Sequence, residues 1–260
     1  MGRSWVLGAI AVGAVTGILF AIFPQWDLEI AGWFWDPVAG KFPLSITWLP
    51  NLARKIGDLT TWLLVLLPAG ALVAKLVFPS ARMLIRPSIA LYLICSFAIA
   101  PGLVTNGLLK PLWARPRPVF VEQFAGQQHF EPWWRPGGDC PRNCSFVSGD
   151  ASQAFWLLAP ASLAPAPVRP LALATAAVFA SGLSGMRVAF GRHFLTDVVF
   201  AAVLTINIIA LCYHLFFRIR DADLEKGIER LAHLLRSPSA LGMAVRQLVS
   251  ACQTKTKETP

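Results

Sequence analysis

Charged residues are scarce in this sequence. Only 14% of its 260 residues are charged, whereas 55% are hydrophobic, and the mean hydropathy is +0.57. These proportions exclude an ordinary soluble domain and indicate a chain that crosses a membrane several times. Cysteine is also sparse, and the five cysteines form neither the dense set of a disulfide-stapled scaffold nor the spacing of a zinc site.

The charges that are present are mostly positive, with a formal net charge of +9. In a soluble chain this excess would suggest a nucleic-acid partner. In a membrane protein Lys and Arg gather in cytoplasmic segments, so topology explains the excess and we expect no nucleic acid to bind.

Six apolar segments predict six transmembrane helices and therefore an all-α, polytopic membrane fold. The first segment is a membrane span rather than a signal peptide, because it exceeds a typical signal core and ends at Pro24 without a small-residue cleavage site. The membrane domain should cover residues 1–217, and residues 218–260 should form a basic tail with an amphipathic helix, on the membrane surface or packed on the protein. The predicted spans are about residues 5–23, 59–78, 88–109, 151–164 (which is short), 171–189 and 194–217.

Six spans place both termini on one side, which should be cytoplasmic because the basic residues of the short loops and the tail gather there. The opposite, outer face receives residues 24–58, residues 110–150 and the turn at residues 187–193. That face carries cations against the topological trend, and an anionic ligand would explain them. These outer cations are Lys110, Arg115, Arg117, Arg135, Arg142, Arg187 and Arg192.

Three polar blocks converge on the outer face, at residues 110–118, 144–150 and 187–197. Together they supply fixed cations, a Ser148-Gly149 turn at the start of a helix, and a histidine with an aspartate four residues later. This combination suits phosphoryl transfer, which depends mainly on positioning and charge stabilisation. The first amides of the helix add an anion-binding end.

His193 and Asp197 are the candidate nucleophile and its orienting residue. At positions i and i+4 of the sixth span they share one helix face, so the carboxylate could hold one imidazole nitrogen while the other attacks phosphorus. Both could instead bind a metal, but the surrounding cations disfavour this. We therefore expect neither a metal nor a cofactor.

The order and spacing of these blocks resemble the type-2 phosphatidic acid phosphatase superfamily, whose membrane branch comprises six-helix lipid phosphatases. Lys110 and Arg117-Pro118 match its first motif, Ser148-Gly149 the second, and Arg187, His193 and Asp197 the third. By resemblance, His193 would form a phosphohistidine that Asp197 orients. The phosphate would be bound by Lys110, Arg117, Arg187, Ser148 and Gly149.

The second motif departs from the family pattern, which usually ends in a histidine that protonates the leaving group. This chain has Asp150 at that position, and we hypothesise that Asp150 is the acid. Burial would have to raise its pKa, whereas nearby cations would lower it. His129 in the same loop is an alternative donor.

Cys140 and Cys144 lie four residues apart on the outer face. In an oxidising compartment they are expected to form a disulfide that braces the chain entering the Ser-Gly turn, although two free thiols are the alternative.

The sequence therefore indicates a lipid phosphatase at the periplasmic face of a bacterial inner membrane. The Cys-Ser-Phe-Val-Ser-Gly block most resembles bacterial members that act on the 1-phosphate of lipid A. Undecaprenyl diphosphate, phosphatidylglycerol phosphate and phosphatidic acid remain alternative substrates. A catalytically silent relative that binds or flips phospholipids is the alternative outside enzymes, and no oligomeric state is predicted.

Overall fold

The computed structural model describes residues 3–80 and 82–236, and within them the chain is helical without strands. The expected all-α fold is thus confirmed. The long helices are α1 (Arg3–Ile22), α3 (Trp48–Val77), α4 (Pro87–Phe97), α8 (Arg169–Ala189), α9 (Leu195–Phe216) and α10 (Asp221–Arg236), and the shorter ones are α2 (Gln25–Gly32), α5 (Lys110–Trp113), α6 (Gly149–Trp156) and α7 (Leu158–Ser162). A π-helical segment, Ala98–Leu109, joins α4 to α5, and the 3-10 turns are Pro43–Ile46, Pro118–Phe120 and Glu122–Phe124.

Five helical segments of the described chain are long and apolar enough to cross a membrane. The fourth predicted span is not among them, because α6 and α7 are each too short to cross a membrane. Both helices lie inside the bundle. Trp156 and Leu158 are fully buried there. A span count of six stays a prediction.

The second predicted span begins earlier than expected. Helix α3 starts at Trp48 rather than near Leu59, so residues 48–58 are helical and not part of an outer loop. Their charged side chains reduce local hydropathy and conceal the helix in the sequence. Arg54 and Asp58 pair one turn apart at 2.9 Å, which is a helix-compatible spacing.

Helix α9 lies at the centre of the bundle and packs against α1, α4 and α6. The core around it contains Tyr92, Trp156 and Ile209, all fully buried. The indole Nε1 of Trp156 donates a hydrogen bond to Ser96 Oγ at 2.9 Å, so the polar end of this large side chain is satisfied. α6 is thereby held against α4 inside the bundle.

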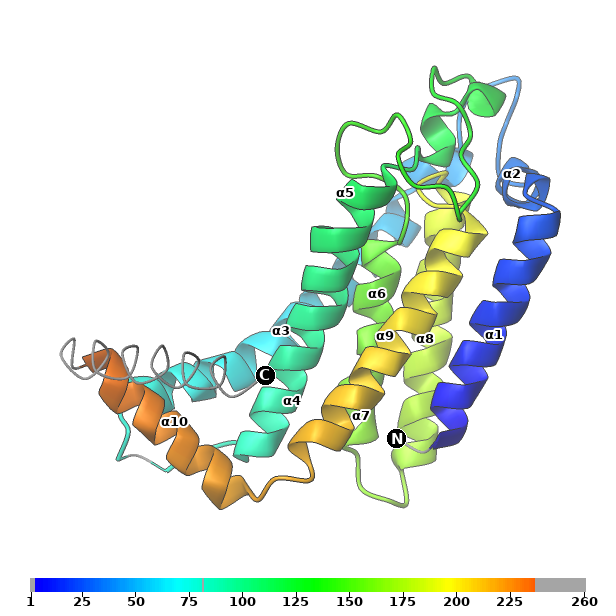
Figure 1. Ribbon diagram of the computed structural model, residues 1–260. Coiled ribbons are helices and arrows are strands. Elements are labelled where there is room, and N and C mark those ends of the chain that lie inside the picture. Colours follow the sequence, from blue (N-terminus) through cyan, green and yellow to red (C-terminus); the bar gives the residue numbers. More distant parts are fainter. Residues whose placement is uncertain (1–2, 81, 237–260) are drawn as a thin grey trace, which may run out of the picture.

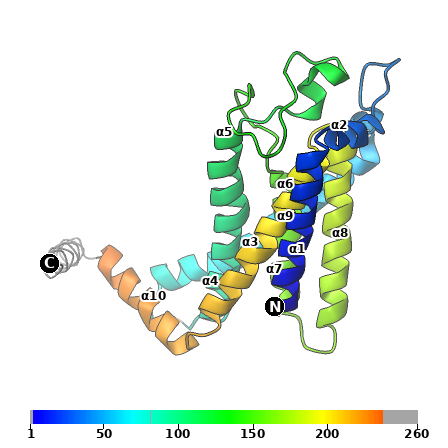
Figure 2. The same cartoon turned by 45° about the vertical axis from the view of Figure 1, so that its right-hand side comes forward.

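The longest connecting loops gather at one end of the bundle, and α10 and shorter loops lie at the other (Figures 1 and 2). The outer-face segments expected from the sequence therefore meet. At the α10 end, Lys75 pairs with Glu225 at 2.9 Å and with Glu229 at 2.6 Å, and Arg86 pairs with Asp221 at 2.7 Å. The predicted tail helix thus packs on the protein, while residues 237–260 of the tail lie outside the described residues.

Candidate active site

The three polar blocks meet at the loop end and are joined by backbone hydrogen bonds. Ser145 N donates to Arg115 O at 2.8 Å, which joins the first two blocks. Ser148 N donates to Asp197 O at 3.1 Å, which joins the second block to the third. Segments far apart in the sequence are therefore positioned by main-chain contacts as well as by side chains.

A cavity of about 350 Å³ opens between these blocks, and its lining is strongly basic. Five cationic side chains face one carboxylate, that of Asp150, and His193 lies among them. Such a surface favours a multiply charged anion. The five cations are Arg54, Lys110, Arg117, Arg187 and Arg192, and the other lining residues are Ser45, Asn51, Asn143 and Phe190.

Lys110 and Arg117 reach this cavity because the helix ends between them. Ala114 adopts a left-handed conformation (φ 47°) that ends α5, and the chain continues through Pro116 and Pro118. Arg117 itself is extended (φ −84°, ψ 153°). The two predicted phosphate ligands thus lie on different local structures but face one space.

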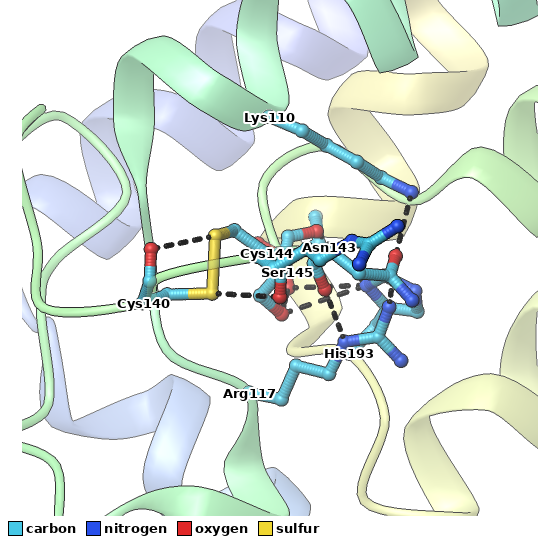
Figure 3. The surroundings of a disulfide bond; sticks show 9 residues. Lys110, Arg117, Cys140, Asn143, Cys144, Ser145 and His193 are labelled. Carbon is cyan, nitrogen blue, oxygen red and sulfur yellow. Dashed lines mark hydrogen bonds and ion pairs between the residues drawn. A yellow bond between two sulfur atoms is a disulfide. The ribbon is translucent and has the colours of Figure 1, made fainter.

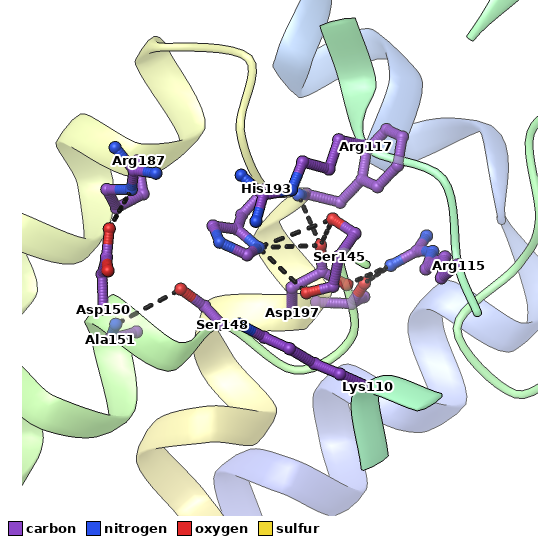
Figure 4. A network of polar contacts seen from close by, with 12 residues as sticks. Lys110, Arg115, Arg117, Ser145, Ser148, Asp150, Ala151, Arg187, His193 and Asp197 are labelled. Atoms are coloured by element: carbon purple, nitrogen blue, oxygen red, sulfur yellow. Dashed lines mark hydrogen bonds and ion pairs between the residues drawn. The ribbon is translucent and has the colours of Figure 1, made fainter. Parts of the chain in front are cut away.

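Ser148 and Gly149 are buried beside the cavity and do not line it. Ser148 caps α6, its Oγ accepting from Ala151 N at 3.2 Å (Figure 4). A Cβ at Gly149 would lie 3.1 Å from Lys110 Nζ and 3.1 Å from Asn106 Oδ1, so the absence of a side chain lets Lys110 approach the helix end. The ammonium group of Lys110 and the N-terminus of α6 therefore lie close together beside the cavity.

His193 sits in a tight turn between α8 and α9. Gly191 has φ +64°, and a Cβ there would lie 2.4 Å from the Phe42 ring. This position requires glycine both for its backbone conformation and for the close approach of Phe42.

The imidazole of His193 is only 2% exposed. Its Nδ1 lies 2.9 Å from the Ser145 carbonyl oxygen, which can only accept, so Nδ1 carries the proton. Burial lowers the pKa of His193 to about 4, although Asp197 acts to raise it. The ring is therefore neutral at pH 7, with Nε2 unprotonated.

Asp197 contacts His193 less directly than expected. Its Oδ2 lies 3.7 Å from His193 Nδ1, beyond hydrogen-bonding distance. The same oxygen accepts from Phe194 N at 2.8 Å and from Ser145 Oγ. Asp197 thus acts on His193 through Ser145, whose carbonyl makes the direct contact (Figure 4).

Arg115 is a further residue of this network, and the sequence did not distinguish it from an ordinary loop charge. It is 0% exposed and donates to Asp197 Oδ1 at 2.6 Å and to Asp27 Oδ2 at 2.8 Å. Asp27, from α2, also accepts from Thr196 Oγ1 at 2.6 Å. The sequence signal was weak, because Asp27 is one of three acidic residues, with Glu29 and Asp36, in a Trp-rich segment.

Asp150 and Arg187 form an ion pair at the cavity wall, with Oδ2 to Nε at 2.6 Å. Burial acts to raise the pKa of the Asp150 carboxyl, but Arg187 and other cations outweigh it and hold that pKa below 3.8. The carboxyl is ionised at neutral pH, which is the opposite of what an acid needs. The alternative donor, His129, does not line the cavity; its side chain is 71% exposed and lies 3.3 Å from Glu122.

Cys140 and Cys144 are joined by a disulfide bond (Figure 3). The loop that it closes contacts the first block, because Cys140 N donates to Ala114 O at 3.0 Å. Between the cysteines, Asn143 reaches towards the cavity. Over residues 3–80 and 82–236, no group of three or more His, Cys, Asp or Glu side chains is placed to hold a metal ion.

Comparisons with known proteins agree with these motifs. The family model described as PAP2 superfamily matches residues 89–221. A lipid A 4'-phosphatase of Francisella tularensis subsp. novicida (strain U112) is 34% identical over 226 residues, which are 85% of this chain and 100% of that protein.

Two shorter matches bear the same name. The lipid A 4'-phosphatase of Rhizobium leguminosarum is 41% identical over 101 residues, 39% of this chain and 43% of that protein. The one of Rhizobium etli is 38% identical over 118 residues, 42% of this chain and 46% of that protein. No solved structure matches this chain.

Proposed function

Because this chain belongs to the PAP2 superfamily, we propose that it removes the 4'-phosphate of lipid A at a bacterial inner membrane. The broader function, that of a membrane lipid phosphatase, agrees with the family, the relatives and the apolar helices. The 1-phosphate expected from the sequence finds no support, since the three relatives are named for the 4'-position. One observation carries the chemistry: a neutral, buried histidine in a cavity with five cations.

His193 is the proposed nucleophile. Its proton is held on Nδ1 by the Ser145 carbonyl, so the lone pair of Nε2 can attack phosphorus. The P–N bond forms as the P–O bond to the sugar breaks, and the phosphohistidine is then hydrolysed by water. Asp197 fixes Ser145 and through it the ring.

Lys110, Arg117 and Arg187 would stabilise the charge on the transferring phosphoryl group. All three line the cavity with His193. Arg117 uses two of its five N–H donors on Asn143, so the other three remain for phosphate oxygens.

The departing sugar oxygen must take up a proton. The role of Asp150 as proton donor stays a prediction. Its ion pair with Arg187 argues against that role, because the pair favours the ionised carboxylate. We propose instead that Asp150 orients the guanidinium of Arg187, with the proton coming from water in the open cavity.

The proposed orientation places the cavity in the periplasm and both termini in the cytoplasm. In its support, Arg86, Arg169 and the basic residues of α10 are assigned to the end away from the cavity by the topology. The substrate headgroup would then enter from the outer leaflet.

The test is phosphate release by purified protein in detergent. The substrates are lipid A labelled at the 1- or 4'-phosphate, undecaprenyl diphosphate, phosphatidylglycerol phosphate and phosphatidic acid. We expect release from the 4'-position, abolished in His193→Ala and retained in the matched control His214→Ala, which lies near the far end of α9. Equal release by wild type and His193→Ala would contradict an enzymatic role, and faster release from another lipid would contradict the substrate.

A further inference from the structure

Asn143 belongs to none of the motifs that resemble the family, yet it contacts two of the proposed phosphate ligands. Its backbone oxygen accepts from Arg117 Nε at 2.9 Å, and its side-chain Oδ1 accepts from Arg117 Nη2 at 2.8 Å. The same Oδ1 lies 3.5 Å from Lys110 Nζ. One residue therefore connects cations that are seven positions apart in the sequence (Figure 3).

The disulfide determines where Asn143 lies. Asn143 is between Cys140 and Cys144 in a loop of five residues closed by the bond. It adopts a left-handed conformation (φ 53°), which asparagine tolerates better than most residues. Two backbone hydrogen bonds attach the loop to the segment that carries Arg117. Cys140 N donates to Ala114 O at 3.0 Å, and Ser145 N, just after the loop, donates to Arg115 O at 2.8 Å.

A neutral acceptor suits this position. Lys110 and Arg117 repel each other, and without an acceptor between them the flexible side chains would move apart. The amide oxygen of Asn143 holds both cations and leaves their positive charge available to phosphate. A carboxylate there would neutralise part of that charge, as Asp150 does for Arg187.

We propose that Asn143, held by the Cys140–Cys144 disulfide, is a positioning residue that sets Lys110 and Arg117 for the phosphate. The proposal rests on the function proposed above, because it assigns these cations to phosphate binding. Breaking the disulfide would release Asn143 and weaken phosphate affinity in an oxidation-dependent manner.

The test compares inorganic phosphate binding, by titration calorimetry, and lipid phosphatase kinetics in Asn143→Gly and wild type. Glycine accepts the left-handed conformation and keeps the backbone acceptor of Arg117 Nε, so the variant removes the side-chain amide and with it the Oδ1 acceptor. Losing a hydrogen bond to a charged group should weaken phosphate binding roughly tenfold and raise KM similarly, with a smaller change in kcat. Arg142→Ala is the matched control: it changes an exposed side chain of the same loop that makes no hydrogen bond or ion pair within residues 3–80 and 82–236.

Reduction of the disulfide gives the second arm. Reducing wild type should weaken phosphate binding about as much as Asn143→Gly does, and reducing Asn143→Gly should add little, because both act through the same contact. Unchanged phosphate binding in Asn143→Gly, or equal losses on reduction in both proteins, would overturn the proposal. Calorimetry keeps the test separate from the function: absence of phosphate release from every lipid would contradict the function, while the binding comparison would still decide the role of Asn143.

Discussion

Replacing Arg115 by methionine should destabilise the protein strongly. The guanidinium is buried between Asp27 and Asp197, with exposed fractions of 0%, 2% and 0% for the three side chains. Methionine fills part of the volume but leaves two carboxylates in a low-dielectric interior without their cation. Breaking a buried ion pair in this way costs about 3–5 kcal/mol.

For a domain of this size, that loss corresponds to a fall in Tm of about 6–20 °C. It can be measured in detergent with a thiol-reactive fluorophore, because Cys212 is buried and Cys95 half-buried in the folded chain. Phosphatase activity measured below the new Tm should also fall, since Asp197 loses the partner that holds it at 2.6 Å.

The matched control is Arg142→Met, the same exchange at an exposed position in the same region. It should leave Tm within about 2 °C of wild type, as surface substitutions usually do. Adding Asp27→Asn to Arg115→Met should recover part of the loss, because it removes one uncompensated charge. If Arg115→Met keeps the wild-type Tm, the buried network does not stabilise the fold and the reasoning is wrong.

Two further predictions concern protonation. Because burial lowers the pKa of His193 to about 4, between pH 6.5 and 4 the unfolded chain binds a proton that the folded chain does not. The free energy of unfolding should therefore decrease as the pH is lowered below 6.5, by about 2–3 kcal/mol at pH 4.5. His193→Gln should lose less Tm than wild type between pH 7 and 4.5, and equal losses would contradict a depressed pKa. Asp150→Asn should lower kcat/KM about tenfold, the scale of one charged contact, with an unchanged profile from pH 5 to 8. If Asp150→Asn instead loses activity mainly at low pH and no longer shows a wild-type decline on the alkaline side, Asp150 is the acid, because a general acid acts only while it is protonated.

The sequence was sufficient to bring the catalytic candidates together. Lys110, Arg117, Arg187 and His193 were expected on one face, and all four line one cavity. This succeeded because helix spans alternate direction, so the topology alone assigns each polar block to an end of the bundle. The order of the motifs supplied the expected role of each residue.

The contacts within the site could not be predicted in the same way. The i, i+4 spacing of His193 and Asp197 places them on one face, but it does not say which acceptor reaches Nδ1. That acceptor is the Ser145 carbonyl, a backbone atom whose position depends on how the loop between two spans folds. Hydropathy also missed the start of α3, since Arg54, Lys55 and Asp58 lie in its first turns.

Arg115 and Arg117 show why residue type alone was ambiguous. They are two positions apart between prolines, and both are outer-face arginines by sequence. Arg115 is enclosed by Asp27 and Asp197, whereas Arg117 faces the cavity with a neutral partner, Asn143. The distinction comes from Asp27, which a separate helix brings in from 88 positions away.

The site therefore consists of two electrostatic layers with different tasks. In the buried layer Arg115 is compensated by two carboxylates, and burial raises the pKa of Asp27 even though Arg115 acts to lower it. The charges of this layer are paired with one another and do not line the cavity. The layer holds Ser145, and hence the imidazole of His193. In the cavity layer the cations exceed the single carboxylate, so their charge is available to an anion. A phosphate that enters the cavity meets this positive charge beside His193, the proposed nucleophile, whose ring is already oriented by the buried layer. Such preorganisation is what phosphoryl transfer requires.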